Sequence, residues 1–297
     1  MYNRLVVTPK KGLANIIPRF LSLRKKKGRL KKHANFKYIL FGLEKRERFA
    51  IQTIILTGGV LITQVIFSDL KFYMVLFLSL ISYILTWWSL KEDIEGNEIY
   101  LLFILPVLFT ASLSLFYFLL PPRWIIRLTT TAMFAVGTYA ILLVENIYNV
   151  ASLRSIQLLR AAQSVGLLIT LIIVFLSANI IYSLRLPFWA NFLLLTLISF
   201  FLALQSLWTI NLDKKLGNEL IMFSLIVAVG IGEMSMALSF WPITTPSFSL
   251  LISASFYTVV GIIQQYLAEK LFSNVIREYI IVFIFTFLLT LVITRWG

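Results

Sequence analysis

The chain of 297 residues contains no cysteine and only one histidine, His33. The absence of cysteine excludes disulfides, thiolate metal sites and cysteine nucleophiles. Because His33 lies in a basic N-terminal segment, a histidine-based zinc cluster or a Ser–His catalytic pair elsewhere in the chain is also excluded. The sequence therefore predicts neither a bound metal nor a cofactor.

Charged residues are also scarce, at 13% of the chain, whereas soluble domains contain about 25%. Hydrophobic residues make up 59%, and the mean hydropathy is +0.89. A chain with so little polar surface cannot face water on all sides. We therefore predict an all-α, polytopic bundle of membrane helices, since lipid offers no partner for an unpaired backbone N–H or C=O group.

Apolar runs of about 20 residues, the length of a membrane span, occur nine times in the sequence. Residues 49–297 are accordingly predicted to form the transmembrane domain. The predicted spans are 50–67, 70–89, 99–120, 124–144, 161–183, 187–208, 219–240, 247–266 and 278–295.

The segment 1–48 is predicted to be a basic cytoplasmic tail, partly disordered or lying on the membrane surface. Residues 1–49 hold 15 of the 27 Lys and Arg and only two acidic residues. Near an anionic leaflet each basic residue contributes about 1 kcal/mol of binding. Setting the topology alone explains the same charges, whereas nucleic-acid binding would rest on charge without a recognisable motif. The residues expected to bind lipid headgroups are Arg24, Lys25, Lys26, Lys27, Arg29, Lys31 and Lys32.

The basic residues also predict the orientation in the membrane. With the N-terminus in the cytoplasm, 22 of the 27 Lys and Arg lie on the cytoplasmic side, as the positive-inside rule requires. Nine spans then place the C-terminus outside. Tryptophans fall at predicted span ends, among them Trp124 and Trp189 outside and Trp208 inside, as interfacial anchors do.

Two stretches of the sequence share features at a constant offset. Trp87 corresponds to Trp208, and the triplet Gly-Asn-Glu at 96–98 recurs at 217–219. The pattern predicts one leading helix followed by two parallel four-helix repeats, residues 87–183 and 208–295. In each triplet the asparagine is expected to be the helix N-cap, with the glutamate near the positive end of the helix.

Glu233 lies inside an apolar span, shortly after Gly230 and Gly232. An isolated charge there costs at least about 2.5 kcal/mol, so the carboxyl is expected to face the bundle interior, pair or stay protonated. Arg127, at a similar depth, is a candidate partner, although its side chain could equally reach the outer headgroups. The two glycines are expected to allow close helix approach or local unwinding.

The stretch "VENIYNVASLRSIQLLRAAQSVG", which begins at Val144, forms a second candidate site. On a helix Arg154, Gln157 and Arg160 share one face, which predicts an amphipathic interfacial helix leading into the next span. Glu145 and Asn146 are expected to cap the other side of the turn. These residues could form a cytoplasmic mouth for an anionic headgroup or substrate, and positive-inside anchoring explains them as well.

The segment "ENIYNVASLRSIQLLRAAQSVG", followed later by "RLPFW", resembles an uncharacterised family of multi-pass membrane proteins from candidate-phylum bacteria. The resemblance implies a bacterial inner membrane. No activity accompanies the family, so no residue role follows from it.

Catalytic groups are few in this chain. All three residues Asp69, Asp93 and Asp213 lie in predicted loops, and no histidine lies in a span. Glu145 and Glu233 have no second catalytic group in view, so the sequence favours a protein that is not an enzyme.

We therefore interpret the chain as a transporter-like helix bundle that handles a small solute or lipid. The alternative is a non-catalytic membrane scaffold or assembly protein whose tail binds anionic lipid, and a homo-oligomer fits either function. The candidate substrate or proton sites are Glu233, Arg127, Glu145, Asn146, Arg154, Gln157 and Arg160.

Overall fold

The computed structural model describes residues 44–65, 70–91, 97–151, 157–212 and 217–294. Its contacts divide the chain into two compact units, Met1–Arg48 and Phe49–Gly297. Nearly all of the first unit lies outside the described residues, so the fold considered below is that of the second unit.

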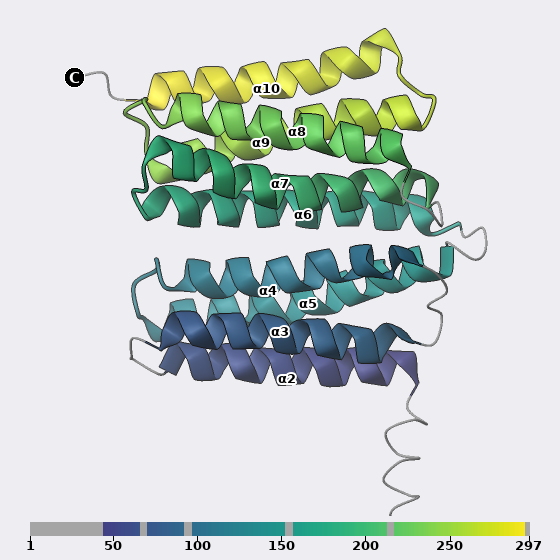
Figure 1. Cartoon of the computed structure of the whole chain (residues 1–297). Coiled ribbons are helices and arrows are strands. Elements are labelled where there is room, and N and C mark those ends of the chain that lie inside the picture. The colour runs from purple at the N-terminus through teal and green to yellow at the C-terminus, as the bar shows by residue number, and fades with distance from the viewer. Residues whose placement is uncertain (1–43, 66–69, 92–96, 152–156, 213–216, 295–297) are drawn as a thin grey trace, which may run out of the picture. The chain divides into compact units, whose positions relative to one another are not determined.

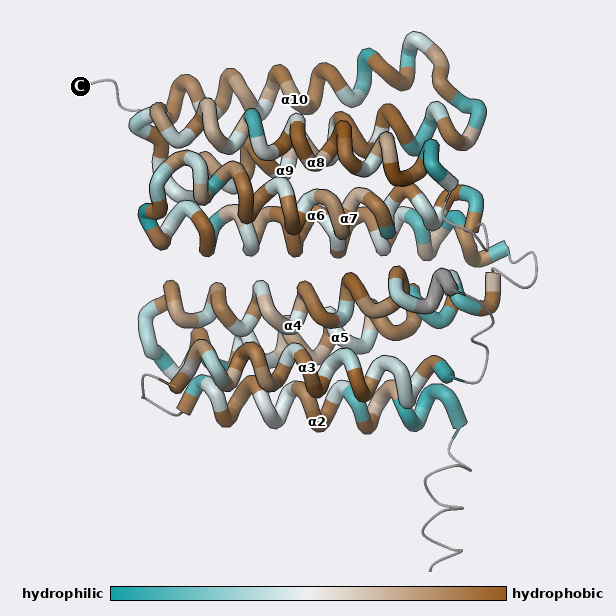
Figure 2. The backbone as a smooth tube through the Cα atoms, in the orientation of Figure 1, coloured by the Kyte–Doolittle hydropathy of each residue, from teal (hydrophilic) through white to brown (hydrophobic). Residues whose placement is uncertain are grey.

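The described part of the chain is helical and contains no strand (Figure 1). Nine of its helical segments are long and apolar enough to cross a membrane. Figure 2 shows hydrophobic residues along the helix bodies and polar residues gathered toward the helix ends. The predicted all-α bundle is therefore confirmed, and its apolar helices fit a multi-pass membrane protein. The elements are α2 (Lys45–Val65), α3 (Lys71–Leu90), η2 (Asn97–Phe103), α4 (Ile104–Tyr117), α5 (Trp124–Ala151), α6 (Leu159–Ser183), α7 (Phe188–Asn211), α8 (Asn218–Leu238), α9 (Thr245–Leu267) and α10 (Ser273–Ile293).

The helices coincide closely with the predicted spans, except that α5 extends well past the predicted end at residue 144. It has 28 residues and ends at Ala151. Glu145 and Asn149 lie within its last two turns, and both side chains are buried. Asn149 donates a hydrogen bond to the Leu90 carbonyl oxygen at 3.3 Å. The helix therefore continues through polar residues because neighbouring helices supply their hydrogen-bond partners.

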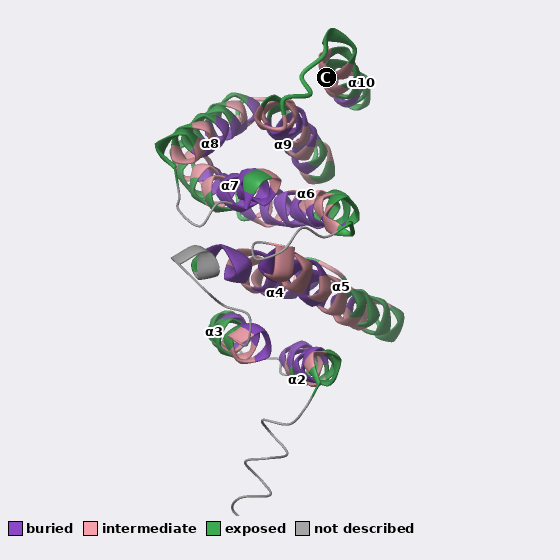
Figure 3. Cartoon of the chain, turned by 90° about the vertical axis from the view of Figure 1, so that its right-hand side faces the viewer, coloured by how far each residue is buried: buried purple, intermediate pink, exposed green. Residues whose placement is uncertain are grey.

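Helices α6, α7, α8 and α9 form a four-helix group, called the α6–α9 group below. Helix α6 packs on α7 and α9, α7 packs on α8 and α9, and α8 packs on α9. Viewed along the helices, the four lie around a common axis (Figure 3), and α10 packs on α9 from outside. Helices α4 and α5 pack on α6, and α3 packs on α4. Phe248, Ile252 and Phe256 of α9 are fully buried, so apolar side chains fill the middle of the group.

Helices α7 and α8 pack against each other through small residues. A Cβ atom added to Gly232 would overlap the side chain of Thr196 and approach the Phe192 ring to 3.0 Å. The predicted close approach at Gly232 is therefore confirmed. At Gly230 a Cβ atom would meet nothing within 4 Å, so this glycine does not contribute to packing in the same way.

The start of α8 differs from the prediction. Gly217 is the N-cap, with extended backbone angles, and Asn218 is the first helical residue, so the predicted asparagine cap is wrong here. Glycine is among the residues that are common at an N-cap. Glu219 lies in the first turn as expected. Trp208 is only 2% exposed, so it is a core residue and not an interfacial anchor.

The predicted duplication stays a prediction. Helix α6, which belongs to the first predicted repeat, packs extensively on α9 of the second. The boundaries 87–183 and 208–295 thus divide helices that pack together in the same bundle.

Candidate functional site

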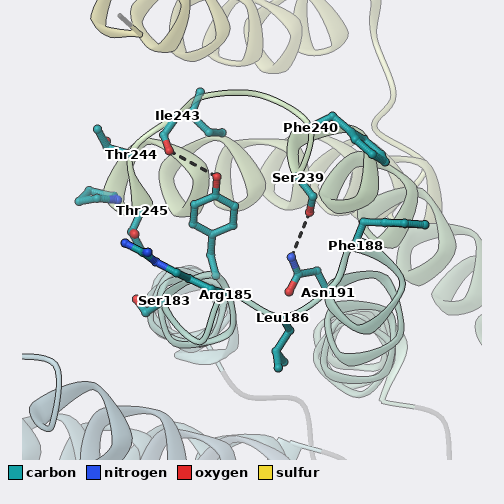
Figure 4. Close-up of a pocket in the computed structure, with 12 residues that line it drawn as sticks. Ser183, Arg185, Leu186, Phe188, Asn191, Ser239, Phe240, Ile243, Thr244 and Thr245 are labelled. Carbon is teal, nitrogen blue, oxygen red and sulfur yellow. Dashed lines mark hydrogen bonds between the residues drawn. The ribbon is translucent and has the colours of Figure 1, made fainter.

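A polar pocket of about 820 Å³ lies at one end of the α6–α9 group (Figure 4). This end, called the pocket end below, is where α6 and α8 finish and where α7 and α9 begin. Ligand pockets commonly have volumes of about 300–1,000 Å³. The pocket is lined by Tyr182, Ser183, Arg185, Leu186, Phe188, Asn191, Ser239, Phe240, Ile243, Thr244, Thr245 and Pro246.

Two turns that are far apart in the sequence build this pocket. After α6, Arg185 adopts a left-handed backbone conformation with φ 50°, and Pro187 is the N-cap of α7. Proline lacks the backbone N–H that a continuing helix needs, so the chain turns before α7 starts. After α8, Thr244 is the N-cap of α9, and its hydroxyl lies 2.9 Å from that of Ser247. Both turns place polar side chains at the mouth of the pocket.

The amide of Asn191 is the most deeply buried polar group in the wall. Its Nδ2 donates to the Ser239 hydroxyl at 3.0 Å, as Figure 4 shows, and joins α7 to α8. The residue is 3% exposed, yet its Oδ1 has no hydrogen-bond partner among the described residues. A buried acceptor without a partner costs about 1–3 kcal/mol. A donor from a ligand or water in the pocket would remove that cost.

Arg185 supplies the only formal charge among the residues that line the pocket. Its side chain is exposed at the rim. The guanidinium group offers five N–H donors in a planar array that suits phosphate or carboxylate groups. The pocket therefore favours an anionic group at its mouth.

Aromatic rings give the pocket an apolar side. The rings of Phe188 and Phe240 lie 5.2 Å apart, one on each side of the α7–α8 contact. Tyr182 stacks on Phe248 at 4.2 Å, and its hydroxyl donates to the Ile243 carbonyl oxygen at 3.4 Å. The pocket thus combines one cation, several hydroxyl groups and aromatic surface.

Glu233 does not face the bundle interior, as the sequence had led us to expect. Its side chain is exposed on α8, whereas Ser224, Ala228 and Ser235 form the buried face of that helix. Glu233 lies one residue beyond Gly232, and a step of about 100° around the helix turns it outward.

Arg127 is also not a partner of Glu233. It lies on α5, beside α4 and α6, whereas α8 packs on α7 and α9. The Arg127 Nε donates to the Tyr117 hydroxyl at 3.1 Å, and the guanidinium lies over the Trp124 ring at 5.0 Å. The predicted pair is therefore wrong.

The predicted cytoplasmic mouth is not formed by one helix. Helix α5 ends at Ala151, residues 157 and 158 form a turn, and α6 begins at Leu159. Gln157 and Arg160 are exposed, Asn146 is half-buried, and Glu145 is fully buried inside α5 and not at the turn. Arg154 lies outside the described residues.

Glu145 instead belongs to a buried polar cluster between α5, α6 and α7. Gln205 donates its Nε2 to the Glu145 Oε1. The Tyr148 hydroxyl donates to the Ala162 carbonyl oxygen at 2.9 Å, and Gln163 donates to the Thr209 carbonyl oxygen at 2.6 Å. The contact between Glu145 and Gln205 was not predicted. The sequence signal for it was a glutamine inside an apolar span, since such a side chain hydrogen-bonds to a neighbouring helix.

Sequence reasoning also missed most of the pocket. Asn191 was not among the predicted site residues, although an asparagine within an apolar span indicates a polar contact between helices, such as its bond to Ser239. Arg185 was also not among the predicted site residues. The predicted headgroup ligands, which lie outside the described residues, are Arg24, Lys25, Lys26, Lys27, Arg29, Lys31 and Lys32.

A family described as "Protein of unknown function (DUF5656)" matches residues 49–293. The chain belongs to this family. The DUF5656 match covers all nine apolar helices except the first residues of α2. No curated protein and no solved structure matches the chain.

Proposed function

We propose that this DUF5656 protein is a transporter-like helix bundle that binds a small amphiphilic anion in the pocket of the α6–α9 group. The proposal rests on the presence of two groups in one pocket. Arg185 lies at the rim, and the Asn191 Oδ1 in the wall has no hydrogen-bond partner among the described residues. The cation suits a phosphate, sulfonate or carboxylate group. The amide oxygen suits a hydroxyl or N–H donor, and Phe188 with Phe240 suits an apolar chain.

A second, smaller hollow at the other end of the same helices supports transport over simple binding. It has about 90 Å³ and is bordered by Trp208, Asn211 and Glu219, among others. Buried apolar residues of α9 lie between the two hollows, including Leu251, which is fully buried. A solute could therefore cross only when the helices rearrange, as in alternating access.

The proposal includes an orientation. The positive-inside rule places the pocket end outside the cytoplasm, and the family resemblance suggests a bacterial inner membrane. Binding of the tail to anionic lipid and assembly into a homo-oligomer are further parts of the proposal. A scaffold without transport is the alternative that the experiment below separates.

Hexyl phosphate is a suitable probe because it combines a dianionic headgroup with a short apolar chain. We expect it to bind the protein in nanodiscs at least about tenfold more tightly than hexanol, since a charge-assisted hydrogen bond contributes about 1.5–3 kcal/mol. Ligand-observed NMR against empty nanodiscs measures both affinities.

Uptake of labelled hexyl phosphate into proteoliposomes tests the transport step. Uptake above that of protein-free liposomes is expected. Equal affinities for hexyl phosphate and hexanol would contradict the anion site, whereas selective binding without uptake would contradict transport and favour the scaffold.

A further inference from the structure

The buried carboxyl of Glu145 lies outside the pocket and forms a separate candidate site. Glu145 lies about 9 Å from the end of α5, at 1.5 Å per residue, at the end of the bundle opposite the pocket. It is completely buried, and Val144 and Tyr148 on either side of it belong to an apolar cluster with Leu204 and Trp208. The carboxyl is therefore kept from water by the packing of three helices.

Only one of the two oxygens of the Glu145 carboxyl has a hydrogen-bond donor among the described residues. Gln205 Nε2 donates to Glu145 Oε1. The other oxygen of each group, Glu145 Oε2 and Gln205 Oε1, is buried and has no donor among the described residues. Both orphan atoms are acceptors, so neither can satisfy the other while the carboxyl is ionised.

A single proton on the Glu145 carboxyl would give both of these oxygens a hydrogen-bond partner. A protonated carboxyl has an O–H donor as well as a carbonyl acceptor, and a primary amide has an N–H donor and a carbonyl acceptor. Two such planar groups that already share one hydrogen bond can close a second when the acid carries the proton. The Glu145 Oε2–H would then donate to Gln205 Oε1, and both buried oxygens would have partners.

Among the described residues, no cation acts on the Glu145 carboxyl. The described titratable group that lies closest to Glu145 is Tyr148, one turn further along the same helix. Helix α7 carries no ionisable residue. Arg160 and Tyr100 are exposed, Lys91 is the C-cap at the end of α3, and Arg48 is buried but does not act on the Glu145 carboxyl.

We propose that Glu145 and Gln205 form an intramembrane proton-binding site, in which the proton lies between Glu145 Oε2 and Gln205 Oε1. The ligand is a single proton, taken from water, and only the O–H bond forms. Buried carboxyl groups within membrane spans commonly serve as proton sites. On the side of α6, the Tyr148 hydroxyl donates its hydrogen bond to the Ala162 carbonyl oxygen and so does not donate to Glu145.

Infrared spectroscopy of the reconstituted protein at neutral pH tests this site. We expect a carbonyl stretch from a protonated carboxyl group that Glu145→Gln removes. The matched control Glu233→Gln changes a carboxyl on the outside of α8 and should leave the Glu145 band in place, so any band that this variant removes belongs to Glu233. Gln205→Leu should shift the band to higher frequency, because the carbonyl loses its N–H donor.

Thermal unfolding keeps the test decisive if a variant folds poorly. The introduced amide of Glu145→Gln can form both hydrogen bonds to Gln205, so its midpoint should equal that of the wild type. Gln205→Leu should lower the midpoint by roughly 2–6 °C. A wild type without the band, a spectrum from which Glu145→Gln removes no band, or a clear loss of stability in Glu145→Gln would each overturn the proposal.

Discussion

Replacing Arg185 with glutamine is expected to weaken hexyl phosphate binding by roughly 10- to 100-fold, without changing the affinity for hexanol. A hydrogen bond to a charged group contributes about 1.5–3 kcal/mol, and every 1.4 kcal/mol is a factor of ten. Glutamine is polar and keeps a Cβ at the left-handed position of Arg185, so the turn should be preserved. Titration in nanodiscs by ligand-observed NMR measures the loss.

Arg160→Gln is the matched control for this prediction. Arg160 is an exposed arginine near the start of α6, at the end opposite the pocket. The control should bind hexyl phosphate as the wild type does. If both variants weaken binding to the same degree, the effect reflects overall charge, and Arg185 is not a specific ligand.

Replacing Gly166 with alanine is expected to lower the stability of the bundle by about 1–3 kcal/mol, the usual cost of adding atoms to a packed core. A Cβ atom at this position would overlap the Tyr148 hydroxyl and approach Val144 Cγ1 to 3.4 Å. Tyr148 is 2% exposed and cannot move outward easily. The change should therefore also break its hydrogen bond to the Ala162 carbonyl oxygen.

Gly230→Ala provides the comparison, since a Cβ atom there meets nothing within 4 Å. Alanine is a better helix former than glycine by about 1 kcal/mol, so this variant should be as stable as the wild type or more so. Thermal unfolding of both variants and the wild type in the same detergent gives the midpoints to be compared. Equal midpoints for the two alanine variants would show that α5 and α6 do not meet closely at Tyr148.

The spans could be predicted from the sequence because a membrane helix needs only a sufficient length of apolar residues. The same criterion failed at the end of α5, since it stops a span at the first charged residue. Glu145 was therefore assigned to a turn, although it lies inside the helix and bonds to Gln205. Whether a polar residue ends a helix depends on a partner in another helix, which local sequence does not specify.

The orientation of individual side chains was also beyond the sequence. Helix α8 is apolar on nearly all sides, so its pattern did not indicate that Gly232 faces inward and Glu233 outward. The pocket was missed for a related reason. Asn191 and Ser239 lie 48 residues apart, and only the packing of α7 on α8 brings them to 3.0 Å.

Water access to the pocket is the most direct test of the account as a whole. The chain has no cysteine, so single-cysteine variants report one position each. Ser239→Cys, in the pocket wall, is expected to react with a membrane-impermeant thiol reagent added from the same side as Thr244→Cys at the rim. Ser249→Cys, at a fully buried position in the next turn of α9, should stay unmodified. Modification of Thr244→Cys without modification of Ser239→Cys would mean that the pocket is closed to water, and the proposed solute site would be contradicted.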